Sequence, residues 1–247
     1  MSKKRFWAGK SGKKLLTEKR VPARMEEHRP VLVSASAGFF GKQKIPVKIY
    51  IDGENFRQSL ERKLRQLKLL GEYATVEKFD LYAMLRDLVC SNISPVYYFS
   101  KVKLPRGYSP DKSTLEVIEF INKRSRYWLG DLRRQGVNMV KAGNLKIKSS
   151  KICRNCREQQ EILQEKGVDV RLAIDIMEDV YVHRIPRMVI LSSDSDICPA
   201  VHKIKGKTQV VYMCFEGSEN RAMSAEVGEK IIIKDKDVKK FYREVAR

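Results

Sequence analysis

The residues with the clearest chemical potential are four aspartates, each at the end of a predicted strand or the start of a predicted helix: Asp52, Asp169, Asp194 and Asp196. Carboxylates that crowd together repel one another, and they stay ionised only if a cation neutralises them. Ligands that are all oxygen select Mg²⁺ or Mn²⁺, and zinc is disfavoured because no His or Cys stands among them. Such a site can activate a water molecule and stabilise the charge on a transferring phosphoryl group.

The elements around these aspartates should bring them together. The apolar run at residues 47–51 predicts a buried strand that leads into Asp52, and a second run at 187–191 leads into the serines and aspartates at 192–196. Asp169 is expected to serve as the N-cap of a helix. Because ligands of open parallel sheets lie beyond the carboxyl ends of the strands, the four carboxylates should meet at one edge. Taken singly, each aspartate is explained at least as well by a helix cap or a turn.

Strands and helices alternate along the predicted chain. The apolar patterns predict strands at residues 47–51, 95–102, 137–147, 187–191, 209–215 and 231–233. Helices are predicted at residues 54–70, 77–90, 112–135, 169–183, 196–205 and 219–226, with another at the C-terminus. This alternation predicts an α/β fold, in which a parallel sheet carries helices on both faces.

The charge of the chain indicates a polyanionic partner. Fifty Lys and Arg residues stand against 30 Asp and Glu residues, for a net charge of +20. A field of this sign attracts RNA, DNA or an acidic membrane surface, although it could also serve solubility alone. Residues 1–44 contain 12 Lys and Arg and 3 Asp and Glu. We expect them to form a disordered basic arm before a single folded domain at residues 45–247.

The cysteine pattern and the hydropathy bear on the compartment. The chain has only five cysteines, an odd number, which argues against a disulfide framework, and no secretory leader is predicted. We therefore expect a reducing, cytoplasmic environment. No run of 18 apolar residues is found, so neither a transmembrane helix nor a membrane partner is expected. The oligomeric state stays open, a homodimer included.

Three segments resemble the signature segments of the NYN domain, a branch of the PIN-like nucleases. They are IDGENF at 51–56, EKGVDVRLAIDI at 165–176 and VILSSDSDICPAV at 189–201, in the family's order and spacing, and the resemblance covers about residues 46–234. It implies a Rossmann-like, PIN-type sheet, an acidic site for Mg²⁺ or Mn²⁺, and cleavage of RNA. Carried over to this sequence, it implies metal binding or catalysis by these aspartates, and a supporting polar role in catalysis for one asparagine: Asp52, Asp169, Asp194, Asp196 and Asn55.

Two positions qualify the resemblance. Asp175 also matches the family string, and a catalytic role is one interpretation; the other is an ion pair with Arg171, one helical turn earlier on the same face. Many family members carry an aromatic residue directly after the last acidic pair, where this sequence has Ile197 and Cys198. Both are apolar and can fill the same buried space, so we do not interpret the change as a loss of activity.

Other motifs carry weaker predictions. Cys153 and Cys156 have the spacing of half a zinc ribbon, but without a second pair they are better explained as free thiols or a labile disulfide. Four aromatic residues could stack on bases, although a place in the core is more usual: Tyr97, Tyr98, Tyr127 and Trp128. A basic stretch at residues 101–148 favours a surface that contacts phosphates beside the acidic site over a merely solvated helix face.

The sequence thus predicts a ribonuclease that hydrolyses RNA phosphodiester bonds, single-stranded or structured, with Mg²⁺ or Mn²⁺ as its cofactor. One alternative is a catalytically silent module of the same fold that binds RNA or regulates it. Another is a phosphatase or phosphotransferase with an aspartyl nucleophile. This second alternative is the weakest, because the residue two positions after Asp52 is Glu54, where an Asp would be expected.

Overall fold

The structure of the chain is a computed structural model that describes residues 46–102, 104, 107, 112–149 and 161–243. The predicted basic arm at residues 1–44 lies outside the described residues, and so do Cys153 and Cys156. Among the residues described, no helix is both long enough and apolar enough to span a membrane.

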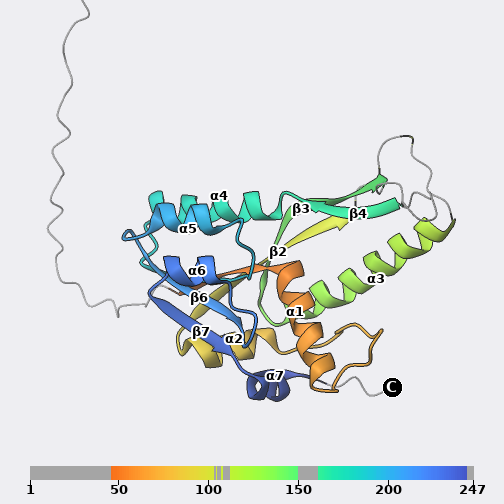
Figure 1. The fold of residues 1–247 in the computed structure, drawn as a ribbon, viewed down its shortest axis with the longest axis horizontal. Coiled ribbons are helices and arrows are strands. Elements are labelled where there is room, and N and C mark those ends of the chain that lie inside the picture. Colours follow the sequence, from red (N-terminus) through yellow and green to blue (C-terminus); the bar gives the residue numbers. More distant parts are fainter. Residues whose placement is uncertain (1–45, 103, 105–106, 108–111, 150–160, 244–247) are drawn as a thin grey trace, which may run out of the picture. The chain divides into compact units, whose positions relative to one another are not determined.

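One sheet of seven strands organises the described part of the chain, in the order β4-β3-β2-β1-β5-β6-β7 (Figure 1). The strands are β1 Val47–Asp52, β2 Ile93–Val102, β3 Asn138–Ser149, β4 Glu161–Lys166, β5 Arg187–Leu191, β6 Gln209–Phe215 and β7 Glu229–Ile233. All neighbouring pairs are parallel except β3 and β4, which are antiparallel. The chain moves outward from β1 to β3 and β4, then returns to place β5 on the other side of β1. The topological switch point therefore lies between β1 and β5, where open α/β sheets bind their ligands.

Helices cover both faces of the sheet, as the alternating pattern predicts (Figure 1). They are α1 Gly53–Gln66, α2 Leu81–Val89, α3 Lys112–Arg134, α4 Val168–Tyr181, α5 Cys198–Ile204, α6 Arg221–Glu226 and α7 Asp235–Phe241. One hydrophobic cluster joins α1, α2, α3 and α7 to the sheet, and a second joins α4, α5 and α6 to its other face. The expected α/β fold is confirmed.

The strand β1 shows why its residues form the centre of the sheet. Successive side chains of a strand point to opposite faces. Ile49 and Ile51 accordingly pack into the first cluster and Tyr50 into the second, and all three are fully buried. A strand buried on both faces needs apolar residues at nearly every position, which explains the unbroken run in the sequence. The run ends at Asp52, because the chain leaves the sheet there and turns into α1.

The strand β4 departs from the predicted architecture. The apolar patterns predict no strand at residues 161–166, yet this segment pairs with β3 and forms an edge of the sheet. Three of the six residues in its sequence, EILQEK, are Glu or Lys, which are depleted in strands. Charged residues are common on edge strands because they discourage pairing with other chains. The pairing with β3 is therefore a tertiary effect that local propensity does not reveal.

Candidate metal centre

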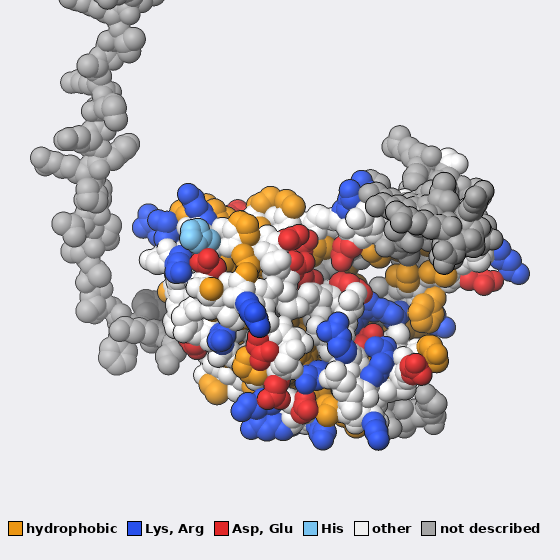
Figure 2. Space-filling model, in the orientation of Figure 1, with side chains coloured by type: hydrophobic (Ala, Val, Ile, Leu, Met, Phe, Trp, Pro, Cys, Tyr) orange, Lys and Arg blue, Asp and Glu red, His pale blue; other side chains and the backbone are white. Residues whose placement is uncertain are grey.

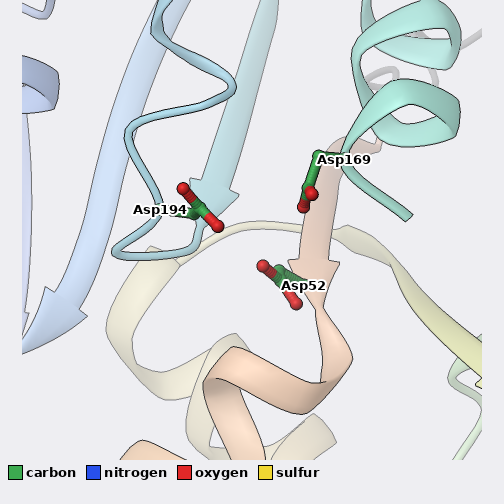
Figure 3. A group of neighbouring side chains, drawn as sticks. All are labelled: Asp52, Asp169 and Asp194. Carbon is green, nitrogen blue, oxygen red and sulfur yellow. The ribbon is translucent and has the colours of Figure 1, made fainter. Parts of the chain in front are cut away.

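Three of the four predicted aspartates converge at the switch point of the sheet. Asp52 ends β1, Asp169 lies in the first turn of α4, and Asp194 lies in the loop after β5. One carboxylate oxygen from each lies within 4.8 Å of the others. Figure 3 shows the three side chains pointing toward one another from these separate elements. The sequence places them 117 and 25 residues apart, so the grouping is a product of the fold.

Asp52 is held by the start of α1 and by the loop after β5. It is the N-cap of α1, where its Oδ1 accepts a hydrogen bond from the backbone N–H of Asn55 at 3.2 Å. Its Oδ2 accepts one from the hydroxyl of Ser192 at 3.2 Å. The residue is only 6% exposed, so both hydrogen bonds compensate part of the cost of burying a carboxylate. Asp52 is therefore a rigid member of the site.

Asp194 is placed by a compact turn after β5. Its backbone N–H donates to the Ser192 hydroxyl at 3.0 Å, and its Oδ1 accepts from the backbone N–H of Asp196 at 2.9 Å. Asn220 supports this turn from the other side, since its Nδ2 donates to the carbonyl of Ser193 at 2.9 Å. The second oxygen of Asp194 is not used in this turn, and it is free to face the other two carboxylates.

Asp169 reaches the site from α4, but it is not the N-cap that the sequence suggested. The N-cap is Gly167, whose φ of +92° is in the left-handed region that glycine tolerates best. The helix therefore starts one residue earlier than predicted, and Asp169 falls in its first turn. An acidic side chain is favourable there because it faces the positive end of the helix dipole. Its carboxylate points toward Asp52 and Asp194 (Figure 3).

The ionised forms of Asp52 and Asp169 are destabilised in the folded protein. Burial, assisted by the charge of Asp169, raises the pKa of Asp52 to about 7, although hydrogen bonds from Asn55 and Ser192 oppose the change. Burial likewise raises the pKa of Asp169, and the charges of Asp194 and Asp196 add to the effect. Both shifts mean that the ionised form lacks a compensating positive charge.

No cation of the described chain supplies that charge. None of the ion pairs formed by the described Lys, Arg and His residues involves Asp52, Asp169 or Asp194. Three carboxylates from separate elements, one of them buried and none neutralised, form a donor set that fits a hard divalent cation. The residues present are therefore those that Mg²⁺ or Mn²⁺ would need.

Asp196 and Asn55 lie beside the group of three. Asp196 is exposed and is not a member of it. It lines a surface depression together with Asp169, whose pKa it raises. Asn55 accepts hydrogen bonds at its Oδ1 from the backbone N–H and the hydroxyl of Ser193, at 3.1 and 3.0 Å. Asn55 thus connects α1 to the loop that carries Asp194, and its side chain holds the loop in place.

Asp175 lies outside the group, one and a half turns along α4 from Asp169. Its Oδ1 forms an ion pair with the Nε of Arg171 at 2.8 Å, and its Oδ2 accepts from the hydroxyl of Tyr98 at 3.0 Å. The ion-pair interpretation describes this arrangement. One turn further along, the buried Asp179 bonds with Lys48 and Tyr50. Together these contacts attach α4 to the strands β1 and β2.

Gly53, the residue after Asp52, packs tightly against the core. A Cβ on Gly53 would lie 2.3 Å from both the Tyr97 ring and the carbonyl of Tyr98, so the close neighbour is the protein itself and not a substrate or a metal. Tyr97 donates to the Gly53 carbonyl at 2.6 Å, and Trp128 donates to Tyr97 at 2.9 Å.

The four aromatic candidates for base stacking divide accordingly. Three are at most 2% exposed and belong to the core: Tyr97, Tyr98 and Trp128. Tyr127, at 62% exposed, is the one that remains available at the surface.

Two further acidic residues flank the site and were not selected from the sequence. Glu165, on β4, is partly buried; burial and the charges of Glu54 and Asp169 raise its pKa. Glu54 is paired with Arg57, whose Nη2 lies 2.6 Å from both of its carboxylate oxygens. Both glutamates stand inside the segments quoted for the family resemblance, beside Asp52 and Gly167. The supporting Asn220 had only a weak signal, as an asparagine before a short helix.

The family model of the NYN domain matches residues 46–233, which includes all the described strands and the three aspartates of the candidate metal centre. No curated protein matches the chain. Among solved structures, a protein of unknown function from Vibrio parahaemolyticus is similar at 15% identity and a TM-score of 0.44, over 83% of this chain and 99% of that one.

Proposed function

The chain belongs to the NYN domain family, and from this membership and its three-aspartate centre we propose that it is a metal-dependent ribonuclease. The family is nuclease-like, which makes the protein a candidate hydrolase. RNA as the substrate, and Mg²⁺ or Mn²⁺ as the cofactor, are the parts that we propose. Both agree with the net charge of +20, which favours a polyanionic ligand.

The grouping of Asp52, Asp169 and Asp194 carries the proposal. Their oxygens approach within 4.8 Å although no described cation holds them together. Crowding of this kind costs stability, and it is best explained by a function that needs several negative charges at one point. A structural ion pair would have supplied its own countercharge, as Lys48 does for Asp179 on the same face of the sheet.

Each residue of the site has a definable task in phosphodiester hydrolysis. A divalent cation, when bound, supplies a Lewis acid that polarises the phosphoryl group and favours ionisation of the attacking water. Asp52, Asp169 and Asp194 would hold that cation. Asn55 and Ser192 position the carboxylates through the hydrogen bonds described above. Asp196 is exposed and lines the same depression as Asp169, and it would orient water or a second cation at the rim.

Paired assays on single variants test the proposal. Asp169→Asn and Asp194→Asn each remove one negative charge with little change of shape. We expect cleavage of an RNA pool to fall by on the order of a hundredfold or more, because electrostatic stabilisation by one group is worth about that much. RNA binding should survive or tighten, because the acidic site repels phosphate.

Asp131→Asn is the matched control, since Asp131 is paired with Arg134 on α3, outside the group. It should leave cleavage near the wild-type rate. If the wild-type protein binds RNA but does not cleave it with either cation, the chain is the silent RNA-binding module instead. If it cleaves and the two variants cleave as fast, the assignment of the site is wrong.

A further inference from the structure

The metal centre cannot by itself account for the binding of RNA. Three carboxylates repel phosphate until a cation is bound, and even then one ion contacts only the scissile group. The affinity for the rest of a strand must come from neighbouring surfaces with positive charge and exposed apolar groups. The location of the bound strand that we infer here rests on the function proposed above.

A cleft leads away from the metal centre between α1, α3 and the carboxyl ends of the strands. It has a volume of about 350 Å³, and its wall begins at Gly53 and Glu54, directly after Asp52. A larger cavity of about 900 Å³ continues along α3. The two cavities share six lining residues: Phe99, Ser100, Ile121, Ser125, Leu129 and Leu145. We call the two together the α3 cleft.

The outer part of the α3 cleft is basic. Four exposed cations line it: Lys101, Lys123, Arg126 and Arg133. In the part of the chain that the structure describes, none of the four is in an ion pair with a carboxylate. Two glutamates, Glu116 and Glu119, line the same cavity and leave an excess of positive charge. Figure 2 shows acidic side chains gathered near the centre of this face, with Lys and Arg side chains over α1 and α3 beside them.

Apolar side chains also line the α3 cleft. Four of the six shared residues are hydrophobic, and Phe120 adds an aromatic ring that is 56% exposed at the rim of the larger cavity. Cations beside exposed apolar and aromatic groups match the two parts of an unpaired nucleotide, its phosphate and its base. A duplex matches them poorly, because its bases are stacked and paired and reach such a wall only if the pairs open.

We propose that the α3 cleft binds single-stranded RNA on one side of the scissile phosphate. Phosphates contact Lys123, Arg126 and Arg133, and a base stacks on Phe120. The strand then passes Glu54 and Gly53 to reach the three aspartates. Single-stranded RNA is therefore the substrate, and structured RNA is cut only where a strand is unpaired.

Binding measured in EDTA tests the cleft without any need for cleavage. The probe is a labelled single strand of mixed sequence, about 12 nucleotides long. The test variant carries Lys123→Gln, Arg126→Gln and Arg133→Gln together. The matched control carries Lys203→Gln, Lys207→Gln and Lys230→Gln. These remove three exposed charges from α5, the turn before β6 and β7, on the other half of the sheet.

The test variant should bind about tenfold or more weakly at low salt. The slope of log K against log salt should fall by about two, at ~0.7 for each lost phosphate contact, whereas the control should keep the wild-type slope. Equal slopes for all three proteins, or an equal fall in test and control variants, would overturn the proposal. So would competition by polyglutamate as effective as competition by RNA, since that would mark a general anion-binding face.

Phe120→Leu separates stacking from charge. It should weaken binding roughly fivefold or more without changing the salt slope, because base stacking does not release counterions. A matching RNA duplex should bind more weakly than the single strand and should respond little to this variant. Tighter duplex binding would overturn the single-strand assignment. If the wild-type protein binds RNA through the cleft but never cleaves it, the ribonuclease proposal is wrong and the assignment of the cleft is supported. If the protein cleaves RNA while the cleft variants bind like the wild type, only the assignment of the cleft is wrong.

Discussion

Asp52→Asn should stabilise the metal-free protein, and should do so increasingly as the pH rises. The folded-state pKa of Asp52 is raised from 3.8 to about 7, mainly by burial. Below pH 4 the carboxyl is protonated in both the folded and the unfolded chain, so burial costs no ionisation energy. As the pH rises from 4 to 7, the unfolded chain gains by losing the proton and the folded chain does not. Stability is therefore lost across that window and stays low above it.

The size of the effect follows from the shift. A change of about three pKa units corresponds to about 4 kcal/mol at pH 8, since one unit is worth ~1.4 kcal/mol, and to about 2 kcal/mol at pH 5. Asn at this position is neutral throughout and keeps an oxygen for the backbone N–H of Asn55. The stability of Asp52→Asn relative to the wild type should therefore rise by ~2 kcal/mol between pH 5 and pH 8. For a domain of this size that is an increase on the order of 5 °C in the Tm difference.

Thermal unfolding in EDTA at pH 5 and pH 8 measures this difference. Asp87→Asn is the control, because Asp87 is an exposed partner of Lys240 far from the metal centre. Asp169, whose pKa is also raised, leaves some pH dependence in the Asp52 variant. A Tm difference that is the same at both pH values would contradict this prediction, and so would a variant that is less stable than the wild type by a larger margin at pH 8. Either result would mean that Asp52 is not an uncompensated buried charge.

Three further predictions follow from the site and the charge of the chain. Asn55→Ala removes the acceptor for the N–H and hydroxyl of Ser193. This variant should weaken the apparent affinity for Mn²⁺ about tenfold or more, with activity largely recovered at high Mn²⁺, and an unchanged Mn²⁺ titration would contradict this. Asp175→Asn should lower cleavage only modestly, because Asp175 contacts Arg171 and not the metal centre, and a hundredfold loss would return it to the catalytic set. Residues 1–44 carry a net charge of +9. If four of their cations contact phosphate, deleting them should lower the slope of log K against log salt for RNA binding by about three, with turnover at saturating RNA unchanged. Identical slopes for the full-length and truncated proteins would rule out a role of this segment in RNA binding.

The sequence was most informative where one residue type has few structural explanations. The apolar runs that form β1, β5 and β6 are strands in the structure within about a residue of the predicted ends, because a strand buried on both faces admits little else. The convergence of Asp52 with Asp194 followed from this alone, since both leave neighbouring parallel strands at the same edge. The carboxyl-end rule for parallel sheets therefore carried most of the site prediction.

The parts that could not be predicted depend on contacts between distant segments. The strand β4 exists because it pairs with β3, and its own residues do not favour a strand. Separating the three grouped aspartates from Asp196 required the path of the turn after β5, which hydrogen bonds to Ser192 and Asn220 determine. The N-cap of α4 was predicted at Asp169 because Asp is preferred over Gly at N-cap positions, but the structure has Gly167 there.

The surface along α3 was anticipated only in part. The sequence indicated a basic stretch beside the acidic site, and five of its described residues line the α3 cleft: Lys101, Lys123, Arg124, Arg126 and Arg133. Lys103 and Arg106, in the same stretch, lie outside the described residues. Phe120 carried no signal in the sequence, since an aromatic residue in an amphipathic helix is usually buried. Its exposure became apparent only with the packing of α3 against the sheet.

Adding metal back to the metal-free protein is the most direct test of whether cleavage depends on a divalent cation. The protein is dialysed against EDTA and incubated with a pool of mixed single-stranded RNA, first in chelator and then with excess Mn²⁺ or Mg²⁺, beside Asp194→Asn treated in the same way. We expect no cleavage in chelator, restored cleavage by the wild-type protein with either ion, and little cleavage by the variant. Undiminished cleavage in excess EDTA would contradict metal dependence, because the three aspartates would then have no ion to hold.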